Sequence, residues 1–157
     1  MKHLWIITTL LLLSVQAQQL KIVAKTFDSD EQKGQTTFNG DVKITKGFDE
    51  LNASKVTVYT NMKRKPTKYI ALGNVSFYIV TENKAIYKGK AQKVIFYPIK
   101  KEYHFYKDVN IQQIDEKKEI IGEEVVIGTV EGKARAKGGS KKPVIMTFEI
   151  EEKETKK

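Results

Sequence analysis

The stretch that decides the fold is 38–59, FNGDVKITKGFDELNASKVTVY. In its first half Val42 and Ile44 alternate with polar residues, and after a turn at 46–49 Val56 and Val58 resume the alternation. Alternation with a period of two residues, bounded by Gly, Asp and Asn, is typical of a half-buried antiparallel hairpin. A helix would need apolar residues three and four positions apart, and these four residues do not have that spacing. The stretch therefore predicts two short strands joined by a turn.

The pattern of this hairpin returns along the chain. Asp or Asn followed by Val begins at positions 41, 74 and 108, so the repeat steps are 33 and 34 residues. The segment ASKVTVY at 53–59 matches AQKVIFY at 91–97, and EEVVI at 123–127 is a weaker third copy. A fixed repeat of this length indicates stacked supersecondary units, none of which buries its apolar face alone.

Each copy has a characteristic dipeptide, here called a step, at the same place just before its apolar pair. The steps are Gly40-Asp41, Gly73-Asn74 and Lys107-Asp108. Glycine next to Asp or Asn inside a strand pattern usually marks a β-bulge or a sharp bend. We therefore expect three bends at one level of the sheet, which curl it into a trough with the apolar face inside. The third copy departs from the pattern, because it has Lys107 where glycine is expected.

The whole chain predicts an all-β protein without helices. Short alternating segments are separated by turn signals, a pattern that favours a curled antiparallel β-sandwich or barrel-like sheet built from repeated hairpins. The domain is expected to span 18–130. The segment 131–142 lacks apolar periodicity and is expected to be a basic loop, followed by a possible last strand at 143–150 and a charged tail.

Residues 1–17 have the pattern of a cleaved export signal. Lys2 and His3 give a positive start, 4–15 is an apolar run, and Val15-Gln16-Ala17 fits the small-residue rule for cleavage before Gln18. The apolar run is too short to be a stable bilayer anchor. We therefore expect a soluble exported protein; a retained anchor or a buried first strand is the alternative.

Charge and cysteine content restrict the class of partner. The chain has no cysteine, so its core must be held by burial without disulfides. Removal of 1–17 takes away Lys2 and leaves 27 basic against 19 acidic residues, an excess that favours an anionic partner. Outside the inner membrane an anionic lipid or glycolipid is a better candidate than nucleic acid. Basicity that serves solubility alone is the alternative.

The sequence favours a non-enzymatic protein without cofactor or metal. After residue 17 it has one histidine, His104, within a strand pattern between aromatic residues, whereas a zinc site needs several ligands at close spacing. Asp28, Asp30 and Glu31 fall together beside a turn, which is a normal place for Asp, although a glycosidase-like pair stays open. No glycine-rich phosphate loop has the required spacing and context.

The recurring Phe-x-Gly-Asp-Val-x-Ile, followed by Ala-x-Lys-Val-x-Val-Tyr, resembles the OstA-like repeat of the lipopolysaccharide transport system. Together with the export signal and the small size, the chain resembles the LptA family of periplasmic bridge proteins over roughly 20–132. The resemblance implies a β-jelly-roll open at both ends, which holds the lipid A acyl chains of lipopolysaccharide between its two sheets. It also implies head-to-tail stacking, with itself and with an inner-membrane anchor and an outer-membrane translocon, in outer-membrane biogenesis.

On this reading, the inward positions of the repeated strands would line a lipid-binding groove. They are Val42, Ile44, Val56, Val58, Val75, Phe77, Ile79, Val94, Phe96, Val109 and Ile111. Each CH₂ group removed from water contributes about 0.8 kcal/mol, so a long apolar trough can hold a glycolipid without polar specificity. Periodicity alone favours the alternative, in which the same residues form an ordinary closed core.

The lipid phosphates would need cations at the rim of the groove. Basic residues in two loops are available: Lys63, Arg64, Lys65, Lys68, Lys100 and Lys101. Stacking would use sheet edges, for which 20–27 and 144–150 are the candidate strands.

Two other functions stay open at this point. An exported basic β-sandwich could bind anionic polysaccharide or glycan on its surface, which exposed aromatic residues would favour; the candidates are Tyr78, Tyr87, Tyr97, Tyr103 and Tyr106. A basic barrel that binds single-stranded nucleic acid is disfavoured by the export signal, so we expect no nucleic-acid partner.

Overall fold

The computed structural model describes residues 18–152, so the predicted export signal lies outside the described residues. This part of the chain forms ten strands: β1 (Leu20–Val23), β2 (Thr26–Asp30), β3 (Gln35–Lys46), β4 (Asp49–Thr60), β5 (Pro66–Val80), β6 (Ile86–Tyr97), β7 (Glu102–Gln113), β8 (Lys118–Gly128), β9 (Ala134–Lys137) and β10 (Ile145–Phe148). The all-β prediction is confirmed. Over the same residues there is no helix with the length and hydropathy needed to cross a membrane.

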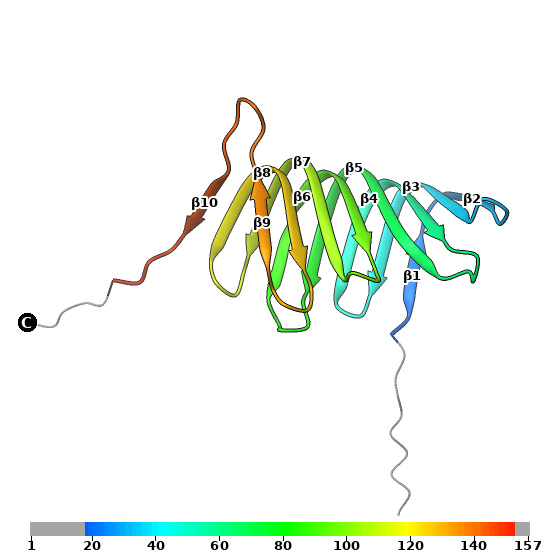
Figure 1. Ribbon diagram of the computed structural model, residues 1–157, viewed down its shortest axis with the longest axis horizontal. Coiled ribbons are helices and arrows are strands. Elements are labelled where there is room, and N and C mark those ends of the chain that lie inside the picture. Colours follow the sequence, from blue (N-terminus) through cyan, green and yellow to red (C-terminus); the bar gives the residue numbers. More distant parts are fainter. Residues whose placement is uncertain (1–17, 153–157) are drawn as a thin grey trace, which may run out of the picture.

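All ten strands belong to one antiparallel sheet (Figure 1). The order is β1-β3-β4-β5-β6-β7-β8-β10, and β2 and β9 pair separately with β3 and β8. The six long strands, β3 to β8, follow one another as hairpins. The predicted hairpin at 38–59 is confirmed as the main part of β3 and β4, with Ile44 opposite Leu51 and Val42 opposite Ala53.

A break in register crosses the middle of every long strand pair. It falls after Asn39, Asn52, Leu72, Lys90 and Tyr106. At this level each long strand passes from one layer of a sandwich to the other. The β2 layer contains 26–30, 35–39, 55–60, 66–72, 93–97, 102–106, 124–128 and 134–137, and the β1 layer contains the other halves together with β1 and β10.

The three predicted bends are confirmed, and all three use left-handed backbone. Gly40 and Gly73 have φ of 84° and 85°, and the residues after them, Asp41 and Asn74, have φ of 45°. Lys107 adopts φ of 66° in the third copy without the freedom of glycine. The left-handed conformation costs a residue with a Cβ roughly 1–2 kcal/mol, so this bend carries strain that the other two avoid.

Burial is complete near the C-terminal strands and incomplete near the N-terminal ones. Phe105, Val109, Ile111, Val125 and Ile127 are all 0% exposed. On the first strands, apolar side chains that face the same interior stay partly exposed; they are Ile22, Phe38, Ile44 and Leu51. The two layers are therefore closed against each other over β7 and β8 and less so toward β1 and β2.

Three sequence-based expectations differ from the structure. Tyr87 was expected on an outward face and is 2% exposed, because Tyr87 and Ala91 point inward while Lys88 and Lys90 point outward. The segment 131–142 was expected to be a loop but contains β9, which pairs with 124–127. The candidate edge strand at 20–27 is two strands, because Lys25 passes the Gly40 bend, where its N–H reaches the carbonyls of Asn39 and Gly40 at 3.1 Å.

Candidate functional site

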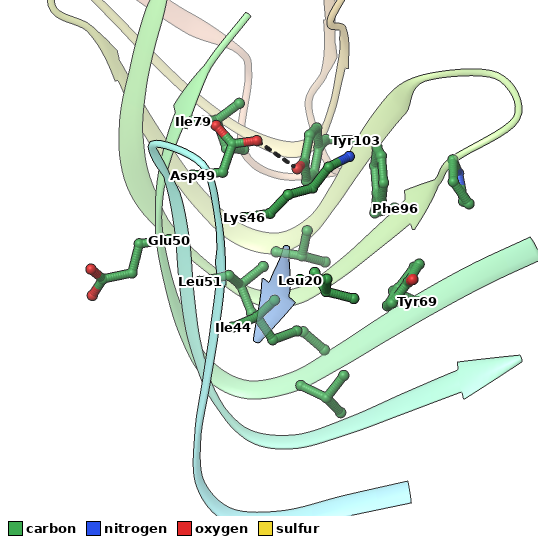
Figure 2. A pocket seen from close by; sticks show the side chains of 14 residues that line it. Leu20, Ile44, Lys46, Asp49, Glu50, Leu51, Tyr69, Ile79, Phe96 and Tyr103 are labelled. Atoms are coloured by element: carbon green, nitrogen blue, oxygen red, sulfur yellow. Dashed lines mark hydrogen bonds between the residues drawn. The ribbon is translucent and has the colours of Figure 1, made fainter. Parts of the chain in front are cut away.

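A cavity of about 140 Å³ lies between the two layers at the less closed end of the sandwich (Figure 2). Its lining comes from β1 and β3 to β7 together with the turn after β6: Leu20, Ile44, Lys46, Asp49, Glu50, Leu51, Val56, Tyr69, Ala71, Ile79, Val94, Phe96, Pro98 and Tyr103. The lining is mainly aliphatic and aromatic. Its size is close to that of apolar protein cavities that stay dry and accept small hydrocarbons.

Cross-strand pairing builds the aromatic wall of the cavity in the β2 layer. Tyr69 lies opposite Phe96, and Phe96 lies opposite Tyr103. The Phe96 and Tyr103 rings stack with centroids 4.4 Å apart, and Tyr69 and Phe96 are 6.0 Å apart. Two residues further along the same strands, Ala71 lies opposite Val94 and forms the part of the wall nearer the bend.

The β1 layer supplies the aliphatic wall. Ile44 and Leu51 are paired across β3 and β4, and Leu20 and Ile79 complete this side of the cavity. Because Ile44 and Leu51 alternate with polar neighbours, the strand period alone places these two on the inner face. The two walls together offer an apolar slot between aliphatic and aromatic surfaces.

One end of the cavity is polar. Asp49 accepts a hydrogen bond from the Val80 N–H at 2.9 Å and one from the Tyr103 hydroxyl at 3.4 Å. Lys46, which pairs with Asp49 across the hairpin, places its ammonium 5.9 Å from the centre of the Phe96 ring. Figure 2 shows Asp49, Tyr103 and Lys46 together between Ile79 and Phe96, on the side away from Leu51 and Ile44.

Burial controls the ionisation of this polar end. It raises the pKa of Asp49 above the ordinary 3.8, while the Val80 N–H, Lys46 and Tyr103 act in the opposite direction. Burial, reinforced by the Asp49 charge, raises the pKa of Tyr103, which is therefore a neutral hydroxyl near pH 7. The polar end thus presents the Lys46 ammonium, the Asp49 carboxyl and the Tyr103 hydroxyl beside a mainly apolar lining.

Five of the predicted groove residues line the cavity: Ile44, Val56, Ile79, Val94 and Phe96. The other six, Val42, Val58, Val75, Phe77, Val109 and Ile111, are buried between the layers at 9% exposure or less. Phe77, for example, packs against Phe105 with ring centroids 4.4 Å apart. The inner face therefore supplies both closed core and cavity lining, often from the same strand; lipid contact at any of the eleven stays a prediction.

The predicted rim cations do not line this cavity. Arg64 is 3.5 Å from Glu31, and Lys68 and Lys100 lie over the rings of Tyr59 and Tyr97. Lys63 and Lys65 are exposed in the loop between β4 and β5. Lys101, 2.9 Å from Glu82, lies at a neighbouring hollow.

Sequence reasoning missed Lys46, Asp49 and Tyr103 as functional candidates. Lys46 continues the inward alternation of Val42 and Ile44, and Asp49 is its partner across the turn. Both were assigned to the turn itself, so the inward alternation was not extended to them. Tyr103 was placed among exposed aromatic residues, although its side chain faces the cavity.

The predicted structural role of His104 concerns a different face of the molecule from the cavity. His104 has its Nε2 2.9 Å from the Glu102 carboxylate and its ring edge-on to Tyr97, on the outer face of the β2 layer. Among residues 18–152, no group of three or more His, Cys, Asp or Glu side chains is placed to hold a metal ion.

Comparison with known proteins gives one family and one fold. Residues 21–133 match the family described as LptA/(LptD N-terminal domain) LPS transport protein. A solved structure described as LptH, the LptA homologous periplasmic component of the lipopolysaccharide transport device from Pseudomonas aeruginosa, superposes with a TM-score of 0.74 at 18% identity. The match covers 85% of this chain and 96% of that one. The search of curated proteins returned no match.

Proposed function

The chain belongs to the LptA/(LptD N-terminal domain) family of LPS transport proteins, and we propose that it is a periplasmic carrier that passes lipopolysaccharide from the inner toward the outer membrane. In this proposal residues 1–17 direct export and are removed. The protein binds lipid and performs no chemistry on it, so it needs no cofactor, metal or nucleic acid. Its partners are lipopolysaccharide, an inner-membrane anchor, an outer-membrane translocon and further copies of itself.

The observation that carries the proposal is the apolar cavity at the less closed end of the sandwich. An acyl chain that enters the cavity leaves water and contacts the aliphatic wall of Ile44 and Leu51 and the aromatic wall of Tyr69 and Phe96. Burial contributes about 0.8 kcal/mol for each CH₂ group. The closed core over β7 and β8 keeps the layers together while the other end accepts lipid.

Transfer between domains would use the four strands at the two ends of the sandwich. β1 and β2 lie at one end and β9 and β10 at the other (Figure 1). Apolar side chains are exposed at both ends, with Phe27 at 70% in β2 and Phe148 at 53% in β10. Edge strands can pair with the opposite end of a neighbour, which would join the apolar interiors head to tail.

Photo-crosslinking tests the carrier function. A crosslinking residue replaces Ile44 or Phe96 in the cavity, and Tyr78, which is 37% exposed on an outward face, is the matched control. With purified lipopolysaccharide we expect adducts at 44 and 96 and none at 78. Absence of adducts at both cavity positions in folded protein would end the carrier proposal.

A second candidate, surface binding of anionic glycan, has one observation in its favour. The ammonium groups of Lys93 and Lys100 lie 5.6 and 5.7 Å from the ring centres of Tyr106 and Tyr97 on the outer face. Lipopolysaccharide from which the acyl chains have been removed distinguishes glycan binding on the surface from lipid binding in the cavity. We expect it not to compete with lipopolysaccharide for crosslinking at 96, whereas a glycan-binding protein would be blocked by it.

A further inference from the structure

The apolar cavity adjoins a second hollow of about 490 Å³. The two share Lys46, Asp49, Phe96, Pro98 and Tyr103, so the polar end of the cavity is also a wall of the hollow. Beyond this shared wall the hollow is lined by polar side chains that include Glu82, Lys84, Lys101 and Thr129. We refer to this hollow as the polar basin.

The fold forms the basin by joining turns from the two layers. The Glu82 N–H donates to the Thr129 carbonyl at 2.9 Å, and the Thr129 N–H donates to the Lys101 carbonyl at 2.9 Å. These bonds hold the turn between β5 and β6 against the turn after β6 and the end of β8. Lys84 and Lys101 both adopt left-handed backbone, with φ of 67° and 52°, where glycine or asparagine would be less strained. Strained positions of this kind concentrate at functional sites.

The charges of the basin favour an anion. Lys46, Lys84 and Lys101 face two carboxylates, Asp49 and Glu82. Glu82 is already engaged by Lys101 at 2.9 Å. Asp49 accepts hydrogen bonds from the Val80 N–H and the Tyr103 hydroxyl. The other two ammonium groups are that of Lys46, which lines both cavity and hollow, and that of Lys84, which lines the hollow alone. A phosphate is the anion that best matches several point charges of this type.

The carboxyl group of Asp49 restricts the ligand further. A carboxylate beside a bound phosphate is unfavourable unless the ligand also brings a hydrogen-bond donor to it. Each carboxylate oxygen can accept a second hydrogen bond. A hydroxyl or amide N–H close to the start of the acyl chain would reach Asp49 at the boundary between cavity and basin.

We propose that cavity and basin form one site for a phosphorylated amphiphile, with its acyl chain between Ile44 and Phe96, its phosphate on Lys46, Lys84 and Lys101, and its hydroxyl or amide donor on Asp49. This inference rests on the proposed carrier function and adds the head-group chemistry. It keeps Lys101 of the six predicted rim cations and replaces the other five by Lys46 and Lys84.

Two single-chain lipids test the site. Lauroyl-lysophosphatidate and monolauroylglycerol carry the same chain and a hydroxyl group, and the first alone carries a phosphate. Binding of each below its critical micelle concentration is measured by calorimetry on the protein without residues 1–17. We expect the phosphorylated lipid to bind tighter by roughly ten-fold or more, since each ammonium contact contributes about 1 kcal/mol.

Two triple variants with the same charge change locate the phosphate. Lys46→Gln/Lys84→Gln/Lys101→Gln should abolish the preference for the phosphorylated lipid, so that the two lipids bind with similar affinity. Lys63→Gln/Lys65→Gln/Lys68→Gln should leave both affinities unchanged. Lys84→Gln alone spares the Lys101–Glu82 pair and should reduce the preference several-fold, which keeps the test valid if the triple variant folds poorly.

The outcomes separate the inference from the function on which it rests. If the unaltered protein binds neither single-chain lipid and gives no lipopolysaccharide adduct, the carrier function fails. If both lipids bind equally, or if the loop variant loses the preference and the basin variant keeps it, the basin inference fails while the carrier function stands.

Discussion

The bends depend on single residues whose backbone most side chains avoid. At Gly73 an added Cβ would lie 2.7 Å from Ser54 Oγ and 2.9 Å from Ser54 Cβ, in addition to the strain of φ at 85°. Ser54 cannot move freely, because its hydroxyl donates to the Gly73 carbonyl at 3.2 Å. Lys107 is the reverse case, since it has a Cβ where the repeat has glycine.

Substitutions at these two positions are therefore expected to change stability in opposite directions. Gly73→Ala should lower the free energy of unfolding by about 1–3 kcal/mol, whereas Lys107→Gly should raise it by about 0.5–1 kcal/mol, which is the relieved strain less the entropy cost of glycine. Urea denaturation measures both. Gly128→Ala is the control, since its Cβ would meet its nearest atom at an ordinary 3.8 Å. A stabilising Gly73→Ala would contradict the role of this bend.

Asp49 gives a pH dependence whose sign follows from its burial. Its pKa is raised in the folded protein, so the folded state binds the proton more tightly than the unfolded chain does. The contribution of this group to stability is therefore present at low pH and is lost as pH rises from the ordinary Asp value through the raised one.

Asp49→Asn removes this titration. We expect the stability of the variant relative to the unaltered protein to increase as pH rises from about 3.5 to 7. Denaturation midpoints of both proteins across this range measure the effect. Asp30→Asn is the contrasting control: hydrogen bonds from Lys33 and Gln32 lower the pKa of Asp30, so the relative stability of that variant should change in the opposite direction. If the relative stability of Asp49→Asn fell as pH rises, the raised pKa of Asp49 would be contradicted.

At the scale of the element, strand period predicted the inner face but could not divide it into core and cavity. Val42 and Ile44 have the same pattern, yet Val42 is 1% exposed and Ile44 lines the cavity. The difference depends on the separation of the two layers, which is set by contacts between residues far apart in sequence. The sequence did not predict β9 because only Ala136 of its four residues, ARAK, packs against the core. One inward residue is too few to give a recognisable apolar alternation.

Filling the cavity should separate lipid binding from stability. Ala71 is 3% exposed and lines the cavity, so Ala71→Leu can place its side chain in existing space, and we expect a stability change within about 1 kcal/mol. Lipopolysaccharide crosslinking at position 96 should be lost. Ala53→Leu is the matched control in the closed core opposite Val42, where overpacking should cost about 1–3 kcal/mol. Undiminished crosslinking in Ala71→Leu would show that lipid uses another surface.

At the scale of the whole molecule, the two unlike ends predict concentration-dependent association. Phe148→Lys places a charge on the exposed apolar face of β10 and should keep the protein monomeric at concentrations where the unaltered protein forms larger species. Met62→Lys, at a fully exposed loop position, is the control. Sedimentation velocity over a concentration series gives the measurement. Equal association of Phe148→Lys and Met62→Lys would remove β10 from the proposed contact.

Because the bends lie at one level of the sheet, further repeats can be added side by side, in the direction across the strands. A further unit of 33 or 34 residues adds two strands to the sheet and one more step at the same height. Such an insertion would lengthen the sandwich by two strand spacings, about 10 Å, and leave its cross-section unchanged. The number of repeats then sets how far one molecule reaches, while the inward residues of each repeat set how wide a chain it can accept. The length of the sandwich and the width of the lipid chain that it accepts can therefore change independently in evolution or by design.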